Sequence, residues 1–328
     1  MIERRAGSGT YISSGTESAA RPGAAALAQI GIIIPCLRHT EIFESILGEI
    51  AGLARGHDYD FWSGISASPT GEAQMSVADA ERLCERFIAG GVRGVFFVPF
   101  EHQADREIAN RHIAERLSKA GIPVVLIDRD FGAFPHRSAY DLVGVDNFAG
   151  GYHLAEHLIK LGVRRFAYVV RPLTASTVDA RIAGVRSALL THGLEAPRSF
   201  VYAGDPTDLK FVRSFARARS FEAVFCASDH LAAQLLQSLN KLGVRVPDDL
   251  RLVGFDNVPF ASLLTVPLTT MDQPCRDIAL TAFNALQERL ANPTLPARTL
   301  MVSPRIVIRE SCGAFAHPTA GSGLANAT

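Results

Sequence analysis

The feature that most constrains the fold is a regular alternation of short apolar runs with longer amphipathic stretches between residues 28 and 270. Short apolar runs are typical of buried strands, and apolar residues spaced three or four apart are typical of helices. Strands that alternate with helices of this length predict parallel sheets with right-handed crossovers. The predicted strands are Gln29–Ile34, Tyr59–Trp62, Gly94–Val98, Val124–Ile127, Phe166–Val170, Ala223–Cys226, Arg251–Phe255 and Arg305–Ile308. The predicted helices are Phe43–Ala54, Ala78–Ala89, Ile108–Ala120, Gly151–Leu161, Ala180–His192 and Leu231–Leu242.

The order of these elements predicts two such sheets, one formed by residues 28–145 and the other by residues 146–272. The segment that follows holds one predicted helix, Arg276–Leu290, and two short strands, too little to form a core of its own. We therefore expect residues 274–300 to return to the first lobe and residues 301–313 to the second. The predicted fold class is α/β, with two doubly wound parallel-sheet lobes joined by several crossings of the chain.

The two ends of the chain differ in composition from this body. Residues 13–27 include the stretch Ser13–Gly23, which is small, polar and contains Pro and Gly, and they predict a linker. Residues 1–12 precede this linker as a short separate piece. Residues 314–328 are rich in Ala, Gly and Thr and predict a disordered tail.

The charge and cysteine content narrow the class of protein. The 33 Lys and Arg residues balance the 33 Asp and Glu residues, so the chain is not mostly a DNA-binding surface. The five cysteines are odd in number and scattered, and none forms a C-x-x-C pair, which favours a reducing, cytoplasmic location over a disulfide framework. The apolar run at residues 24–34 is too short to span a membrane. A buried first strand explains it better than a signal peptide, so neither a membrane partner nor export is expected.

Polar side chains follow several of the predicted strands. In open parallel sheets, ligands bind beyond the carboxyl ends of the strands, so these positions are candidates for a ligand site. The set at or near the strand ends is Asp128, Arg129, Arg181, Ser228, Asp229, Asp256, Asn257 and Gln273.

The chemistry of this set favours a sugar. Carboxylates, guanidinium groups and carboxamides are planar, and each can pair with two adjacent hydroxyls. A buried group of this kind discriminates strongly, because an analogue that lacks the hydroxyl leaves it unpaired. Phe43 and Phe131 lie near strand ends, where an aromatic ring can cover the apolar face of a sugar. The alternatives are structural: polar residues at strand ends also cap helices, and large aromatic residues also fill cores.

Motifs for enzyme chemistry are scarce. There is no Gly-x-Gly-x-x-Gly after the first strand, no Walker-type loop and no Gly-x-Ser-x-Gly elbow. One pattern stands out, His153-Leu-Ala-Glu156-His157, which matches the H-x-x-E-H motif of inverted zinc peptidases and would place both histidines on one helix face. A five-residue pattern also arises by chance, and we expect no catalytic residue, no metal and no cofactor.

Five long stretches carry ordered sequence patterns: Gly121–Asp130, Val143–Val169, Arg181–Leu194, Ala223–Pro274 and Val307–Cys312. Through these stretches, and from about Ala28 to Cys312, the chain resembles the effector domain of the lactose/galactose repressor (LacI/GalR) family. That family shares its fold with periplasmic sugar-binding proteins, so the resemblance implies a periplasmic-binding-protein type I clamshell. It also implies that the helix with the H-x-x-E-H pattern is a packing element.

The resemblance implies particular effector contacts. Carried over residue by residue, they are Asp128, Thr177, Arg181, Ser228, Asp256 and Gln273. Arg129 adds a match to ribose- and galactose-type binding proteins, which look similar in their Asp-Arg pair. Ser228 stands where many relatives have Asn, and His39-Thr40-Glu41 replaces the usual Asn-Pro-Phe near the first strand. A pentose or hexose is implied, and a phosphorylated sugar or a purine stays open.

The segment Met1–Ile12, MIERRAGSGTYI, resembles the final wing of a gluconate-repressor (GntR) type winged-helix domain. The resemblance rests on Arg4, Arg5, Gly7 and Gly9, and arginines beside glycines suit a tight hairpin near DNA phosphates. Arabinose-type repressors combine this module with the sensing domain. The resemblance therefore implies a remnant of a DNA-binding domain whose recognition helices would precede Met1, and a flexible basic leader is the alternative.

Three functions compete at this stage. The first is the ligand-sensing domain of a sugar-responsive bacterial transcriptional repressor. Its partners would be a small-molecule effector, operator DNA through a domain mostly missing from this chain, and a second copy in a homodimer, with Phe43–Ala54 and Ala78–Ala89 as candidate contacts. The second is the solute-binding protein of a sugar transporter, which needs an export signal. The third is an enzyme, favoured only by the H-x-x-E-H pattern.

Overall fold

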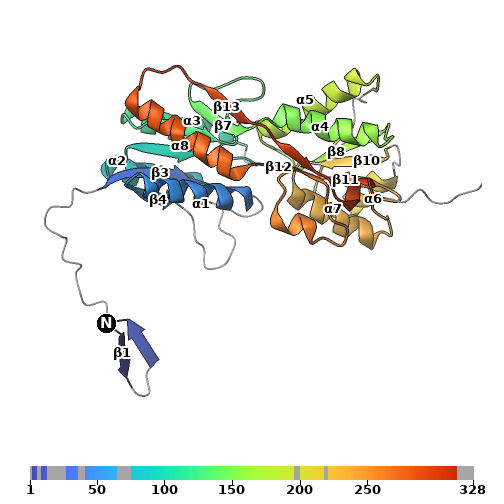
Figure 1. The fold of residues 1–328 in the computed structure, drawn as a ribbon, viewed down its shortest axis with the longest axis horizontal. Helices are drawn as coiled ribbons and strands as arrows, with labels where there is room; N and C mark the ends of the chain where they lie inside the picture. Colours follow the sequence, from blue (N-terminus) through green and yellow to red (C-terminus); the bar gives the residue numbers. More distant parts are fainter. Residues whose placement is uncertain are drawn as a thin grey trace, which may run out of the picture.

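The computed structural model describes residues 2–5, 9–12, 27–35, 41–64, 75–102, 104–195, 200–217 and 221–315. The body consists of two α/β lobes that lie side by side along the long axis of the molecule (Figure 1). Each lobe is a parallel sheet covered by helices, which confirms the predicted fold class.

The first lobe is built on a six-stranded sheet with the order β13-β7-β6-β5-β3-β4, in which all pairs are parallel. The strands are β3 (Ala28–Ile33), β4 (Tyr59–Gly64), β5 (Gly94–Phe97), β6 (Val124–Ile127), β7 (Asp141–Val145) and β13 (Thr299–Val302). Its helices are α1 (Glu41–Gly56), α2 (Val77–Ala89), α3 (Arg106–Lys119) and α8 (Cys275–Ala291). Contacts join α1 to α8 and α2 to α3.

The continuous apolar runs of this sheet follow from burial on both faces. Successive side chains of a strand point to opposite faces, so every position of a covered strand must be apolar. In β5, Phe96 packs in one hydrophobic cluster, while Val95 and Phe97 pack in the other. In β6, Val125 and Val124 divide in the same way. This explains why these strands lack polar alternation in the sequence.

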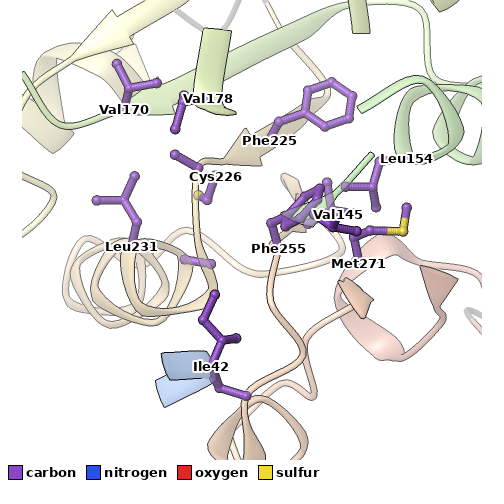
Figure 2. Packing of buried hydrophobic residues seen from close by; sticks show 14 of the residues in the cluster. Ile42, Val145, Leu154, Val170, Val178, Phe225, Cys226, Leu231, Phe255 and Met271 are labelled. Atoms are coloured by element: carbon purple, nitrogen blue, oxygen red, sulfur yellow. The ribbon is translucent and has the colours of Figure 1, made fainter. Parts of the chain in front are cut away.

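The second lobe is built on a four-stranded parallel sheet with the order β11-β10-β8-β9. The strands are β8 (Phe166–Val170), β9 (Val201–Ala203), β10 (Ala223–Cys226) and β11 (Arg251–Val253). Its helices are α4 (Asn147–Lys160), α5 (Ser176–Thr191), α6 (Leu209–Arg217) and α7 (Asp229–Lys241). Figure 2 shows part of the hydrophobic cluster to which its core belongs, including the side chains of Phe225, Phe255 and Met271.

Two glycines let α4 and α5 approach closely. A Cβ atom at Gly151 of α4 would overlap the backbone carbonyl of Arg181, and one at Gly184 of α5 would overlap the carbonyl of Phe148. The two helices therefore pack backbone against backbone, with no room for a larger residue at either position. This contact fixes the height of Arg181 on α5 relative to α4.

The chain passes between the lobes after β7, after β12 (Thr270–Asp272) and after β13. β12 pairs antiparallel with β14 (Arg305–Val307), and isolated bridges join Val253 to Thr269 and Asp256 to Asp272. These segments tie the edge of the second sheet at β11 to the crossings.

The C-terminal segment is anchored to the first lobe by buried charge. Asp141 at the start of β7 is fully buried and pairs with Arg289 of α8 at 2.9 Å and with Arg298 at 3.2 Å. Residues 301 and 302, assigned above to the second lobe, lie in the first sheet as part of β13, which pairs with β7. The other boundaries proposed for lobes, linker and tail stay predictions, and most of the linker and tail lie outside the described residues.

At the N-terminus, β1 (Ile2–Arg5) and β2 (Gly9–Ile12) form an antiparallel hairpin in which Arg5 pairs with Gly9. Gly7 lies outside the described residues, as do Cys36 and the His39-Thr40 part of the segment near the first strand. Among the described residues, no helix has the length and apolar character needed to cross a membrane.

Candidate functional site

A cavity of about 420 Å³ lies between the two lobes. It is lined by α1 and by the segments that follow β5 and β6 in the first lobe, and by α5, α7 and the segments that follow β8, β10 and β11 in the second. This is the edge where ligands bind in open parallel sheets. A more open hollow of about 750 Å³ lies at the opposite edge of the second sheet, and none of the predicted site residues line it.

The structure brings most of the predicted site residues together. The lining of the cavity includes Phe43, Asp128, Arg129, Thr177, Arg181, Ser228, Asp256 and Gln273. Three apolar side chains labelled in Figure 2, those of Ile42, Val178 and Leu231, also line it. Residues far apart in the sequence therefore meet at one place because the strand ends of both sheets face each other.

Three candidates do not line the cavity: Asp229 accepts a hydrogen bond from Thr270, Asn257 donates one to Asp272, and Phe131 points elsewhere. Phe131 is buried in the first lobe, with its ring 5.9 Å from that of Tyr140 and the guanidinium of Arg111 at 5.6 Å. The reason is the preceding residue: the Asp130 carboxylate accepts hydrogen bonds from the backbone N–H groups of Gly132 and Ser138 and so reverses the chain. Phe131 is consequently a core residue.

Arg129 is the centre of an ion network on the first lobe. Its side chain is 6% exposed, its Nη1 pairs with the Glu101 carboxylate, and its Nε lies 3.3 Å from Asp128 Oδ2. Its guanidinium also stacks 5.3 Å from the centre of the Phe43 ring. Burial is the largest single effect and opposes ionisation of Glu101, but the charge and hydrogen bond of Arg129, with His102 and Arg181, together outweigh it and lower the pKa of Glu101. Arg129 thus holds a carboxylate and an aromatic ring in fixed positions at the cavity wall.

Two aspartates at the strand ends have unusual backbone conformations. Asp128 has φ = 71° and Asp256 has φ = 119°, in the region that residues with a side chain rarely adopt. Such positions destabilise the fold by about 1–3 kcal/mol each and cluster at ligand sites. The turns after β6 and β11 accept this conformation and so direct both carboxylates at the cavity.

Asp256 is held from the second lobe. Gln273 Nε2 donates a hydrogen bond of 2.7 Å to Asp256 Oδ1. Burial raises the pKa of Asp256 to about 7, against the opposing effect of the Arg181 charge and the Gln273 hydrogen bond. Burial also raises the pKa of Asp128, although Arg129 and Arg181 act in the other direction. Both carboxyls therefore gain from a partner that donates hydrogen bonds to them.

Arg181 supplies the donors opposite these acids. It is 5% exposed, and its Nε donates to Asn147 Oδ1 at 2.7 Å while its Nη1 donates to the Ala227 carbonyl at 2.6 Å. The guanidinium lies 3.6 Å from the centre of the Phe255 ring. Within the described part of the chain it makes no direct ion pair, so its remaining N–H groups are available to a ligand.

Two hydroxyl residues complete the set at helix starts. Ser228 Oγ accepts a hydrogen bond from Leu231 N at 3.2 Å and caps α7, so the helix-capping alternative holds for this residue. Its hydroxyl hydrogen is still free to be donated. Thr177, in the first turn of α5, is 8% exposed, and its hydroxyl has no hydrogen-bond partner in the ranges that the structure describes.

The structure adds polar lining residues that the sequence reasoning missed: Glu101, His102, Arg171 and His230. Arg171 directly follows β8, and the strand-end rule applied to that position would have found it. Glu101 follows β5 only after the intervening residues 98–100, so its distance from the strand concealed it.

The H-x-x-E-H residues lie on α4, away from the cavity. His157 Nε2 lies 3.4 Å from Cys312 Sγ, and Glu156 pairs with Lys160 at 2.9 Å and with His192 at 3.7 Å. In the described ranges, no group of three or more His, Cys, Asp or Glu side chains is arranged to hold a metal ion.

Known proteins resemble this chain in sequence and in fold. Residues 155–312 match the family described as periplasmic binding protein-like domain. The HTH-type transcriptional repressor PurR of Escherichia coli O1:K1 / APEC is 34% identical over 172 residues, which cover 51% of this chain and 50% of the repressor. The chain thus spans about half the length of the curated relatives it matches.

Solved structures extend the likeness over the body. A complex of the transcriptional regulator CelR with cellobiose has a TM-score of 0.71 at 25% identity and covers 86% of this chain and 84% of its own. A LacI family transcriptional regulator from Mycobacterium smegmatis has a TM-score of 0.69 at 25% identity and covers 86% of this chain and 98% of its own. Residues 155–312 are therefore similar to a periplasmic-binding-protein-like domain, and the body of the chain has the fold of solved transcriptional regulators, one of them of the LacI family.

Proposed function

We propose that this chain is the ligand-sensing part of a sugar-responsive bacterial transcriptional repressor, which binds a monosaccharide-like effector between its two lobes. One observation carries the proposal: a single cavity collects Asp128 from the first lobe and Arg181 and Asp256 from the second. These groups are buried, planar and multidentate, which is the chemistry that selects neighbouring hydroxyls.

The arrangement favours a polyhydroxyl ligand over an apolar one. The buried carboxyls of Asp128 and Asp256 accept hydrogen bonds, and Arg181 and Gln273 donate them. A hydroxyl can do both, so a sugar can satisfy both kinds of group at once. The Phe43 ring, beneath the Arg129 guanidinium, offers an apolar surface for the C–H face of a sugar ring. A ligand without hydroxyls would leave these groups buried and unpaired.

A regulator is favoured over a transport protein by the sequence relatives. PurR, at 34% identity over half of the chain, is a transcriptional repressor, and the CelR complex contains cellobiose, a sugar. The fold alone does not separate the two functions, because solute-binding proteins share it. The proposal also includes a cytoplasmic location, a homodimer and operator DNA as a partner of the whole regulator.

The proposed output is a change in lobe geometry. Backbone and side-chain contacts already join the lobes across the cavity, since His102 N donates to Leu173 O at 3.0 Å and Ser176 Oγ donates to Asp130 O at 3.2 Å. An effector that contacts both lobes favours the closed arrangement and shifts the relative placement of two subunits. The hairpin of β1 and β2, in which Arg4 and Arg5 lie on one strand and Gly9 on the other, supports the proposed GntR-type wing.

Ligand-induced thermal stabilisation tests the proposal. A panel of aldopentoses and aldohexoses should raise the melting temperature of the chain for at least one member. Arg181→Ala and Asp256→Ala should each abolish that shift, because each removes a buried group that faces the ligand. Arg213→Ala, an exposed arginine on α6, is the control and should keep the shift. Unchanged shifts in both cavity variants would overturn the assigned site.

A further inference from the structure

The strand order places the lining residues at different distances from the lobe crossings. In the first lobe, β6 with Asp128 adjoins β7, which leads to a crossing, whereas β5 lies one strand farther out. In the second lobe, β11 lies at the crossings. Beyond β11, the backbone of Asp256 forms an isolated β-bridge with the backbone of Asp272, the last residue of β12. β10 and β8 follow in that order away from it. The cavity therefore has a crossing end, with Asp128, Asp256 and Gln273, and an outer end.

The outer end is lined by three side chains that can donate hydrogen bonds: Arg171 after β8, His230 on α7, and His102 after β5. Gln234 holds two of them side by side, because its Oε1 accepts from Arg171 Nη2 at 2.8 Å and its Nε2 lies 2.9 Å from His230 Nε2. The remaining guanidinium donors of Arg171, on Nε and Nη1, have no hydrogen-bond partner within the described ranges.

His102 approaches the same end from the first lobe. Its Nδ1 lies 3.1 Å from the Pro172 carbonyl, which can only accept, so Nδ1 carries the hydrogen. Its Nε2 lies 3.8 Å from Glu101 Oε1. The outer end is therefore made by both lobes and assembles when they meet.

Negative charge at the outer end is largely compensated. Glu101 is the carboxylate that lines this part of the cavity, and it is paired with the buried Arg129. Asp205 lies 3.7 Å from Arg171, but its side chain is 51% exposed and does not line the cavity. The crossing end by contrast holds two carboxyls, so the cavity is polarised along its length.

The first turns of two helices also face the outer end. The first turn of α5 contributes Thr177, a residue 8% exposed whose hydroxyl has no hydrogen-bond partner among the described residues, and the residue before this helix, Ala175, provides no side-chain cap. The first turn of α7 lies behind Ser228 and carries His230. Backbone N–H groups at a helix start favour negative charge nearby. The outer end therefore contains the Thr177 hydroxyl, the guanidinium donors of Arg171 that have no partner among the described residues, and the first turns of α5 and α7.

We propose that the effector is a monosaccharide that carries an anionic oxygen group, a phosphate ester or a carboxylate, at the end of the molecule that faces Arg171, His102 and His230. This inference rests on the proposed function, because the hydroxyls of the same ligand bind at Asp128 and Asp256. Arg171 is the specificity-determining residue: its planar fork matches the oxygens of a phosphate or carboxylate, and such bonds are stronger than bonds between neutral groups.

Calorimetric titration of the full chain tests the inference. The ligands are the common D-aldopentoses and D-aldohexoses, the terminal phosphate ester of each, and the uronic acid of each. For at least one sugar, an anionic form should bind about tenfold or more tightly than the parent sugar. In Arg171→Gln, that ratio should fall at least about fivefold, because the charged donor is gone. Arg213→Gln makes the same change on exposed α6 and should leave the ratio as it is.

The outcomes separate the two proposals. If a neutral sugar binds and every anionic form binds no better, the inference is wrong and the proposed function stands. If an anionic form is preferred but Arg171→Gln and Arg213→Gln change the ratio alike, the assignment to the outer end is wrong. If no member of the panel binds, the proposed function fails and the inference fails with it. The phosphate and uronate arms identify which anionic group the outer end accepts.

Discussion

Asp128 and Asp256 occupy matching places in the two lobes, each just after a buried parallel strand and each with a positive φ. Their charge environments differ. Asp128 lies 3.3 Å from the buried Arg129, which also pairs with Glu101. Asp256 accepts a hydrogen bond from the neutral Gln273 and forms no direct ion pair among the described residues.

The second-lobe aspartate also has an acidic neighbour. Asp229 is fully buried, and its carboxylate accepts hydrogen bonds from Val258 N and Thr270 Oγ1. Burial, followed by repulsion from Asp256, raises the pKa of Asp229 well above its usual range. Two aspartates that both have positive φ therefore belong to different networks. The first-lobe arm, around Asp128, is an ion network with Arg129 and Glu101, and the second-lobe arm, around Asp256, has a carboxyl whose raised pKa makes it sensitive to pH.

The largest effect is expected from breaking the first-lobe network. Arg129→Met should lower the free energy of unfolding by about 3–5 kcal/mol, because removing one partner leaves buried carboxylates uncompensated. The midpoint of urea unfolding measures this. Arg165→Met is the matched control, since Arg165 pairs with Glu222 at the surface with both side chains at least 40% exposed. That change should cost at most about 1 kcal/mol. Equal losses in both variants would show that the Arg129 network adds no special stability.

A smaller effect is expected from removing the charge of the second-lobe arm. The folded pKa of Asp256 is about 7, above an unfolded value of about 3.9. The folded state then binds the extra proton between these values, so the contribution of Asp256 to the stability of the ligand-free chain is greatest below about pH 4 and is lost as the pH rises through about 7. Asp256→Asn keeps the acceptor for Gln273 and removes the charge. It should raise stability at pH 8 by about 2 kcal/mol and flatten this fall.

Urea unfolding of the ligand-free chain at pH 5 and at pH 8 checks this prediction. Asp128→Asn is the comparison variant. Its pKa is also raised by burial, but Arg129 opposes that effect at 3.3 Å, so its substitution should flatten the fall less. If Asp128→Asn flattens the pH dependence as much as Asp256→Asn, the distinction between the two arms does not hold.

Much of this comparison could be predicted from the sequence, because Asp128 directly follows β6 and Asp256 ends the apolar run that begins in β11, and both runs are easy to identify. Their ionic partners were harder to predict. Glu101 follows β5 only after the intervening residues 98–100, and its pairing with Arg129 depends on how two loops meet in space. β7 was missed for a related reason: it begins at Asp141, a charge that is buried only because Arg289 and Arg298 return from the C-terminal segment.

The aromatic predictions show the same limit. Phe43 and Phe131 both lie near strand ends, but the side on which each ring lies is decided by tertiary contacts. Arg129 stacks on Phe43 at the cavity wall, whereas the turn made by Asp130 sends Phe131 into the first-lobe core beside Tyr140. Hydrogen bonds of a turn that closes over eight residues, such as that from Ser138 to Asp130, leave no periodic signal in a sequence.

The smallest effect is expected at Ser228 in the second lobe, which caps α7 and also lines the cavity. Ser228→Ala removes the cap that Leu231 N uses and should lower the free energy of unfolding by about 1 kcal/mol. Ser228→Asn keeps a capping oxygen and should stay within a few tenths of a kcal/mol, because Asn and Ser cap about equally well. If the hydroxyl also donates to the effector, Ser228→Ala should weaken sugar binding about five- to tenfold, the equivalent of one hydrogen bond. Urea unfolding measures the contribution of the helix cap, and calorimetric titration measures the affinity for the sugar. A lower free energy of unfolding with unchanged affinity in Ser228→Ala would show that Ser228 only caps α7.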